Sequence, residues 1–216
     1  MGRRGFKSHV IVRSNPPQKS PYTCYKLDLE QDFHERCAYC NLHKHSVAIS
    51  FEIDHFIPVK TFRGVRDDLR EDYTNLVYAC KKCNRAKGSQ FSGDIKSDTV
   101  TNEKFYDPVE VDYNTIFYRN EYGAIASDDA KGRDMIADIK LYRPIHMLGW
   151  ICEQFCQTKD KLDYEISHES DPNRKVLLEQ VKLKIAEKYM DYARIFNATY
   201  NDPNFSFSDF ENNLSQ

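Results

Sequence analysis

Long apolar runs are missing from this sequence, and their absence excludes the helical membrane proteins first. No stretch of about 18 consecutive apolar residues occurs, so no segment is expected to span a bilayer as a helix. The first residues also lack the apolar core of a secretory or twin-arginine signal. Phe6 stands where an N-myristoylation signal requires Ser or Thr. We therefore expect a cytoplasmic protein with no membrane partner and no lipid anchor.

A strong net charge is missing as well, which excludes a protein coated in positive charge. The formal net charge is −2, but a local basic face remains compatible with nucleic-acid binding. The two ends of the chain are charged oppositely. The charged residues concerned are Arg3, Arg4, Lys7, Arg13 and Lys19 near the beginning and Asp202, Asp209 and Glu211 near the end.

The remaining composition names no function. Apolar residues make up 40% and charged residues 30% of the chain, as in an ordinary soluble globular protein. A chain of 216 residues can form one compact unit or two small ones.

The seven cysteines are the first informative feature. Because cytosolic thiols are kept reduced, they indicate metal binding or catalysis before disulfides. Cys37-x-x-Cys40 and Cys80-x-x-Cys83 are two pairs whose two-residue spacers let both thiolates face one tetrahedral ion. Four thiolates leave no open coordination position, so the pattern predicts a structural zinc site. A redox dithiol is the alternative, but it needs only one such pair.

Two further cysteines lie four residues apart in an apolar helical pattern. Cys152 and Cys156 accompany Leu148 and Phe155, and we interpret them as core packing rather than a second metal site.

Periodicity predicts a mixed chain whose C-terminal half is mainly helical. Branched and aromatic residues favour a strand at 46–57, which Pro58 ends, and a second apolar run leads from Leu76 into Cys80. The remaining predicted elements are a short helix or turn at 26–36, a loop or short turn of helix at 59–74, a hairpin at 112–126, helices at 128–141, from Pro144 and at 173–197, and a polar joint at 159–173.

The region between and after the cysteine pairs carries a family resemblance. It contains Asp54-His55-Phe-Ile-Pro58, then Asn75 before the second pair and Asn84 directly after it. These residues, with the pairs themselves, resemble the HNH or ββα-metal endonucleases, in which a hairpin and one helix hold a single divalent cation. The match covers residues 37–91, about a quarter of the chain.

The resemblance implies a role for each of these residues. Asp54 and Asn84 would be ligands of the catalytic metal, His55 the general base, and Asn75 a brace of the loop. Asn84 stands where the family name has its last histidine, which makes this ligand neutral. The implied fold is an α+β protein whose ββα-metal core is braced by a zinc site formed by four cysteines, followed by a mainly helical C-terminal part.

Elementary chemistry agrees with this assignment. Cleavage of a phosphodiester needs an activated water and a cation against the developing negative charge. His55 titrates near neutrality, and the side-chain oxygens of Asp54 and Asn84 suit Mg²⁺ or Mn²⁺. Neighbouring residues of a regular strand point to opposite faces, so Asp54 and His55 cannot both face the metal from one. A bulge or the end of the strand is therefore required at these two residues.

Basic residues surround the second cysteine pair. Lys81, Lys82, Arg85 and Lys87 are either the solvated start of a helix or contacts to phosphates, and beside a nuclease site we favour phosphate contact. DNA is the expected substrate.

We divide the chain into four regions. They are a basic extended arm at 1–22 that could lie along a DNA backbone, an HNH module with its zinc knuckles at 23–126, a helical region at 127–200 and an acidic aromatic tail at 201–216. The alternative to a nuclease is a non-catalytic zinc module that binds nucleic acid or protein.

The pattern is also similar to stand-alone bacterial HNH proteins. Some of these serve anti-phage systems, including the Septu type, which pairs the nuclease with an ATPase. This similarity implies that the helical half and the tail aromatics Phe205, Phe207 and Phe210 dock a partner protein such as an ATPase.

Overall fold

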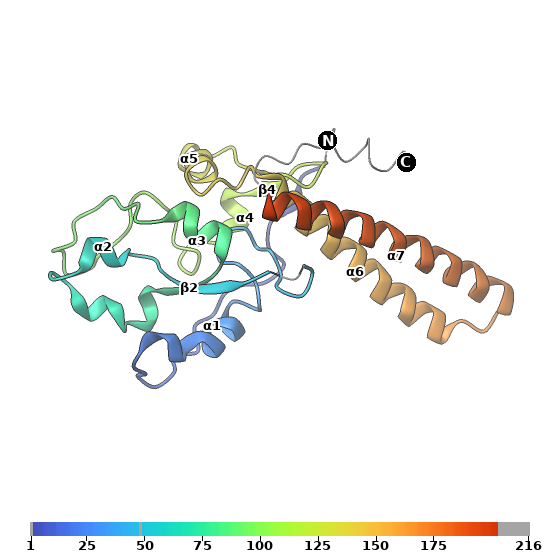
Figure 1. Ribbon diagram of the computed structural model, residues 1–216, viewed down its shortest axis with the longest axis horizontal. Coiled ribbons are helices and arrows are strands. Elements are labelled where there is room, and N and C mark those ends of the chain that lie inside the picture. Colours follow the sequence, from blue (N-terminus) through green and yellow to red (C-terminus); the bar gives the residue numbers. More distant parts are fainter. Residues whose placement is uncertain (1, 48, 203–216) are drawn as a thin grey trace. The chain divides into compact units, whose positions relative to one another are not determined.

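The computed structural model describes residues 2–47 and 49–202, which form two separate units (Figure 1). The first unit ends at Arg143, and the second begins at Pro144 and also includes His45–Val47. The predicted α+β fold class, with four neighbouring cysteines and a helical C-terminal part, is confirmed. No helix in these described ranges is long and apolar enough to cross a membrane.

The elements of the first unit are short. They are β1 (Arg4–Gly5), η1 (Tyr22–Tyr25), α1 (Lys26–Asp32), β2 (Phe51–His55), α2 (Val59–Phe62), η2 (Asp67–Arg70), η3 (Tyr73–Asn75), β3 (Leu76–Cys80), α3 (Lys81–Lys87), α4 (Tyr113–Ile116), β4 (Tyr118–Arg119), β5 (Ile125–Ala126) and α5 (Ala130–Asp138), where η denotes a 3₁₀ helix.

An antiparallel hairpin followed by one helix forms the centre of this unit. β2 pairs with β3 from Phe51 opposite Cys80 to His55 opposite Leu76, and α3 follows β3 without a loop. All residues of β3 are buried, which explains its continuous apolar sequence. α3 ends at Gly88, whose φ of 54° is favourable for glycine. α1 and α3 both contact β2 (Figure 1).

The strand predicted at 46–57 is shorter than expected and ends at His55. A strand end was expected at Asp54 and His55, and β2 does end at His55. Residues 59–74 form short helical turns, as the prediction of a loop or a short helix allowed.

The N-terminal arm is extended and packs onto the rest of the first unit. β1 pairs with β4, and Phe6 is only 2% exposed. The Arg13 guanidinium donates hydrogen bonds to the backbone carbonyls of Tyr73, Thr74 and Leu76. These contacts hold the arm against the rest of the first unit.

The hairpin predicted at 112–126 is only partly present. Its first residues form α4, capped by the Asp112 carboxylate, and the strands β4 and β5 have two residues each. The side chain of Asn120 accepts hydrogen bonds from the backbone of Tyr122 and Ala124 and so forms the turn.

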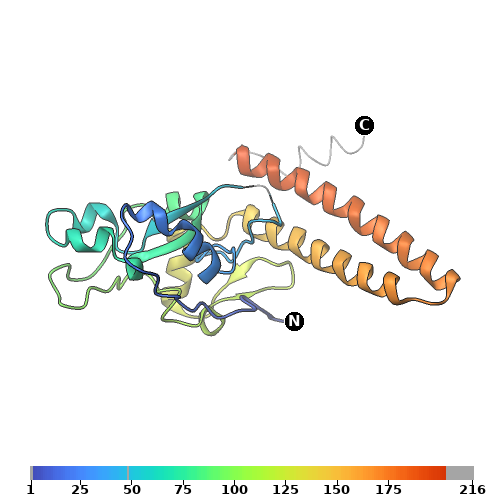
Figure 2. The ribbon, with the colours of Figure 1, turned by 90° about the horizontal axis from the view of Figure 1, so that it is seen from below.

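The second unit is a helical hairpin of α6 (Pro144–His168) and α7 (Pro172–Asn201), which run side by side in Figures 1 and 2. The joint predicted at 159–173 is wrong, because α6 continues to His168 and Asp171 already caps α7. Cys152 is fully buried among apolar residues of α6, as predicted, and Cys156 is half-buried.

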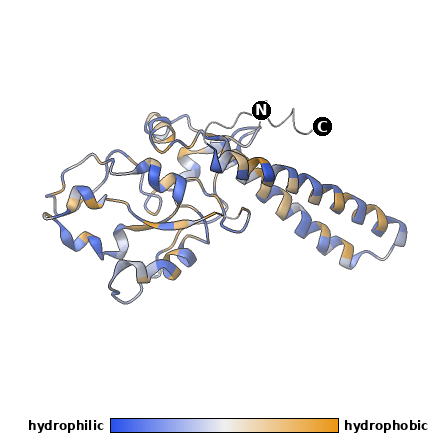
Figure 3. Cartoon of the chain, viewed as in Figure 1, coloured by the Kyte–Doolittle hydropathy of each residue, from blue (hydrophilic) through white to orange (hydrophobic). Residues whose placement is uncertain are grey.

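Hydrophobic residues recur along both helices of this hairpin (Figure 3). The side chains of Ile195 and Phe196 are buried, but several apolar side chains of α7 are exposed, namely Val176, Leu177, Val181, Leu183 and Met190. The division between the units falls after Arg143, later than the boundary we placed at residue 126. The aromatics expected to dock a partner, Phe205, Phe207 and Phe210, lie outside the described residues.

Candidate active site and metal centre

The four cysteines of the two pairs meet in one buried cluster. Cys37 and Cys40 lie in the turn after α1, Cys80 ends β3, and Cys83 lies in α3. Their sulfur atoms all lie within 4.8 Å of one another. This cluster ties the beginning of α3 to a turn about 40 residues earlier in the chain. Among the described residues it is the one group of His, Cys, Asp and Glu side chains close enough to hold a metal ion.

The donor set of this cluster fits a soft tetrahedral cation. Burial disfavours the Cys37 thiolate, but hydrogen bonds from Cys40, Cys80 and Cys83 outweigh burial and hold the pKa of Cys37 well below its usual value. Burial raises the pKa values of Cys40 and Cys83. A cation that binds all four sulfurs would stabilise each as a thiolate, which is the chemistry of closed zinc sites.

Asp54 is buried near the end of β2 and its carboxylate has two partners. The Lys87 Nζ lies 3.0 Å from both carboxylate oxygens, and the Tyr39 hydroxyl donates to Oδ2 at 2.6 Å. Burial raises the pKa of Asp54, whereas Lys87 and Tyr39 work in the opposite direction. A carboxylate offers about four lone-pair positions, so these contacts leave roughly one free on Oδ1.

Lys87 therefore does not lie where we expected it. Its side chain is fully buried, and its ammonium also donates to the backbone carbonyl of His55 at 2.8 Å. The expectation that Lys87 contacts phosphate from an exposed helix face is corrected: in this structure the lysine holds Asp54 and the end of β2 together.

His55 is held in one orientation at the end of β2. Its Nε2 lies 2.9 Å from the carbonyl oxygen of Arg70, and its ring contacts the edges of Tyr22 and Phe62. A carbonyl only accepts hydrogen bonds, so Nε2 carries the proton and Nδ1 of the neutral ring is the basic nitrogen. Burial lowers the pKa of His55, which favours this neutral form.

Asn84 lies half-buried on α3 and contacts β2. Its Nδ2 donates to the Glu52 carboxylate at 2.8 Å, so its Oδ1 is the end of the amide left for another partner. Glu52 was not among the predicted site residues. A signal was present, because residues two apart in a strand share a face, and Glu52 precedes Asp54 by two.

Asn75 ties down the long loop between β2 and β3. Its Oδ1 accepts from the Ile57 backbone amide, and its Nδ2 donates to the carbonyls of Ile57 and Leu69. The side chain is buried and its amide is saturated by backbone groups. This geometry is that of a brace and leaves Asn75 no role as a metal ligand.

A positive cluster lies at the beginning of α3. Burial and the nearby charges of Arg143, Arg85 and Lys81 lower the pKa of Lys82. Lys81 and Lys82 are half-buried and Arg85 is exposed. Arg143, whose side chain contacts the carbonyl of Lys82 at 3.5 Å, joins this cluster, although nothing in the sequence pattern connected it to α3.

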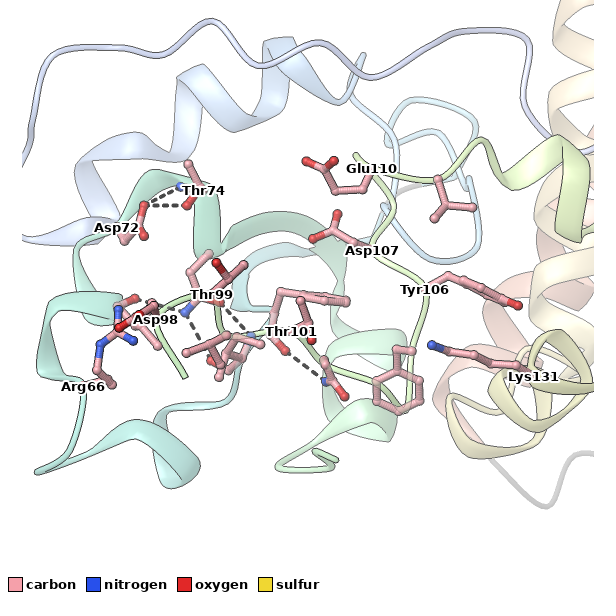
Figure 4. A pocket seen from close by; sticks show the side chains of 18 residues that line it. Arg66, Asp72, Thr74, Asp98, Thr99, Thr101, Tyr106, Asp107, Glu110 and Lys131 are labelled. Carbon is pink, nitrogen blue, oxygen red and sulfur yellow. Dashed lines mark hydrogen bonds between the residues drawn. The ribbon is translucent and has the colours of Figure 1, made fainter. Parts of the chain in front are cut away.

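A cavity of about 680 Å³ is lined in part by the loop that Asn75 braces (Figure 4). Its lining includes Asp72, Asp98, Asp107 and Glu110 but neither Asp54, His55 nor Asn84. Figure 4 shows Asp107 and Glu110 close together on one wall. The carboxylates would repel a phosphate backbone, so this cavity is a poor candidate for a nucleic-acid interface.

Comparison with known proteins identifies a match to the segment that holds β2, β3, α3 and the four cysteines. Residues 37–90 match the family model of the HNH endonucleases. The Septu protein PtuB of Bacillus thuringiensis is 30% identical over 92 residues, which are 43% of this chain. The matched stretch spans only 32% of the length of that curated relative. No solved structure matches the chain. Residues 37–90 thus match the HNH endonucleases, which indicates a nuclease.

Proposed function

We propose that this protein is a metal-dependent endonuclease that hydrolyses phosphodiester bonds of DNA. The observation that carries the proposal is the state of His55, a neutral imidazole whose Nε2 is engaged by the Arg70 carbonyl and whose Nδ1 is basic. It adjoins Asp54, which lies on the strand that Asn84 contacts. A histidine fixed in this way, with a carboxylate as its neighbour in the chain, is suited to general-base chemistry.

His55 has one task in this proposal. Its Nδ1 takes a proton from a water as the water oxygen bonds to phosphorus and the bond from phosphorus to the leaving oxygen breaks. The leaving oxygen is then protonated by solvent. The Arg70 carbonyl holds the ring and stabilises the imidazolium that forms, because Nε2 keeps its proton throughout.

Asp54 and Asn84 would hold Mg²⁺ or Mn²⁺, since carboxylate and amide oxygens are the ligands that these hard cations prefer. When bound, the cation supplies Lewis-acid stabilisation of the phosphate charge. The Tyr39 hydroxyl and the Lys87 ammonium orient the Asp54 carboxylate, as neighbours of metal ligands commonly do.

The remaining residues of the site position these groups. Cys37, Cys40, Cys80 and Cys83 would bind one structural Zn²⁺ and so fix the beginning of α3 to the turn after α1. Lys81, Lys82, Arg85 and Arg143 would contact phosphates without reading the bases.

The competing function is a zinc module that binds DNA without cutting it. One observation favours it: both oxygens of Asp54 are already engaged by Lys87 and Tyr39, which a module without catalysis would tolerate. A supercoiled plasmid separates the two functions. A nuclease converts it to nicked and linear forms in Mg²⁺ or Mn²⁺ but not in EDTA, whereas a binding module retards the plasmid and leaves it supercoiled.

We further propose a role in phage defence in the cytoplasm, together with a protein partner such as an ATPase. The similarity to a Septu protein supports the role, and the exposed apolar side chains of α7 support a partner on the helical hairpin.

A further inference from the structure

Glu52 contacts the proposed metal ligand Asn84 but has no place in the catalytic assignment so far. It lies in the middle of β2, half-buried, with Ala79 opposite it on β3. Its Oε2 accepts a hydrogen bond of 2.8 Å from Nδ2 of Asn84. The contact joins residues 32 positions apart in the sequence and bridges β2 and α3.

The chemistry of the two groups fixes the orientation of the amide. An ionised carboxylate only accepts hydrogen bonds, so the asparagine must present its NH₂ end to Glu52. The opposite end, Oδ1, is then the atom that faces away from Glu52. The last torsion of an asparagine has a broad, nearly two-fold preference, so without such a contact the amide can turn over. A turned amide would present hydrogen atoms to a cation.

We propose that Glu52 is a positioning residue that keeps the Oδ1 of Asn84 directed at the divalent cation. The proposal rests on the assignment of Asn84 as a metal ligand. Each oxygen ligand then has its own supporting group, because Tyr39 and Lys87 hold Asp54 in the same way as Glu52 holds Asn84.

Two substitutions separate positioning from direct ligation by the carboxylate. Glu52→Gln removes the charge but keeps an amide oxygen that can accept the hydrogen bond from Asn84. Glu52→Ala removes the acceptor. If Glu52 positions Asn84, glutamine substitutes for it and alanine does not. If the carboxylate itself bound the cation, both variants would lose its negative charge, and glutamine would not restore the affinity of the parent.

The readout is Mn²⁺ binding to the zinc-loaded full-length protein, measured from the EPR signal of free Mn²⁺, which needs no turnover. Loss of a supporting group typically costs 10- to 100-fold in metal affinity, so Glu52→Ala should raise the Mn²⁺ dissociation constant at least ~10-fold, and Glu52→Gln no more than ~3-fold. In an Asn84→Ala background, Glu52→Ala should have no further effect. Glu121→Ala, which changes an exposed glutamate in the turn between β4 and β5, is the matched control.

The outcomes distinguish this inference from the proposed function. A parent that binds and uses Mn²⁺, with Glu52→Ala binding it equally well, overturns the positioning role alone. Equal losses in Glu52→Gln and Glu52→Ala, or additive losses with Asn84→Ala, also overturn it and assign direct ligation. A parent with no Mn²⁺ binding overturns both the metal site and this inference.

Discussion

The two proposed metal ligands differ in how deeply they are built into the fold. Asp54 is 6% exposed and is the counter-charge of the buried Lys87, whereas Asn84 is half-buried and its side chain contacts Glu52. Removing one partner of a buried ion pair leaves an uncompensated charge in the interior. Substitution of either residue should weaken metal binding, but only substitution of Asp54 should also lower the free energy of unfolding strongly.

We predict that Asp54→Asn lowers the free energy of unfolding by about 3 kcal/mol or more, because Lys87 loses its counter-charge. Asn84→Ala should change it by less than about 1 kcal/mol, as for other partly exposed polar residues. Both should require more Mn²⁺ for cleavage. Urea unfolding and Mn²⁺ titration of the two variants check this, and equal stability of the two would show that the ion pair does not support the fold.

Lys87 shows how much of a single residue's environment can be predicted from the sequence. Its charge was evident, and its burial was inferable because positions 83, 84 and 87 share one face of a helix. Its partners were not inferable. Tyr39 and Asp54 are 15 residues apart, and the Arg70 carbonyl is 15 residues from His55, so these contacts depend on how the chain returns to β2.

At the scale of elements, α3 combines a buried face with a positive face that is half-buried or exposed. Lys81, Lys82 and Arg85 lie outside the ion pair that Lys87 forms. Changing all three to glutamine should weaken binding equally to DNA of unrelated sequence and should reduce the slope of log K against log salt by up to ~0.9 per lost contact. Fluorescence anisotropy at several salt concentrations measures the slope, with Lys161→Gln on α6 as control. A loss restricted to one sequence would contradict pure phosphate contact.

The cysteine cluster joins α3 to the rest of the domain, so its metal should be needed for folding. Elemental analysis should find one zinc per chain. Cys80→Ser should lose the zinc and lower the unfolding temperature strongly, since structural zinc contributes folding free energy directly. Cys24→Ser, at an exposed cysteine, should retain both zinc and stability. A Cys80→Ser protein with full zinc content and an unchanged unfolding temperature would contradict a structural zinc site at these cysteines.

The elements that the sequence predicted well are those with a strong local pattern. The apolar run of β3 and the strand of β2 were recognisable, because burial of a strand imposes a pattern on its sequence. The joint predicted at 159–173 was wrong because polarity alone does not end a helix. Lys159 and Asp163 form an i,i+4 ion pair there, and Lys182 of α7 contacts the same aspartate.

For the whole molecule, the sequence predicted that the cysteines and the HNH residues belong to one site. It did not predict that the N-terminal arm packs against the segments that form this site. The spacing of cysteines, Asp54, His55 and Asn84 carried a resemblance that the family match supports. The packing of the arm through Phe6 and Arg13 carried no such signal, because it depends on backbone carbonyls of η3 and β3 that any sequence would offer.

The most direct test of the account is the cleavage rate of zinc-loaded His55→Asn in saturating Mn²⁺. Asparagine is not a base at neutral pH, and general-base catalysis is typically worth 10² to 10⁴ in rate, so we predict a loss of at least ~10²-fold with unchanged zinc content. His34→Asn is the matched control, because the Nε2 of His34 also contacts a backbone carbonyl, but on the exposed surface. Cleavage by His55→Asn at the parent rate, with the same zinc content and purity, would contradict the catalytic assignment.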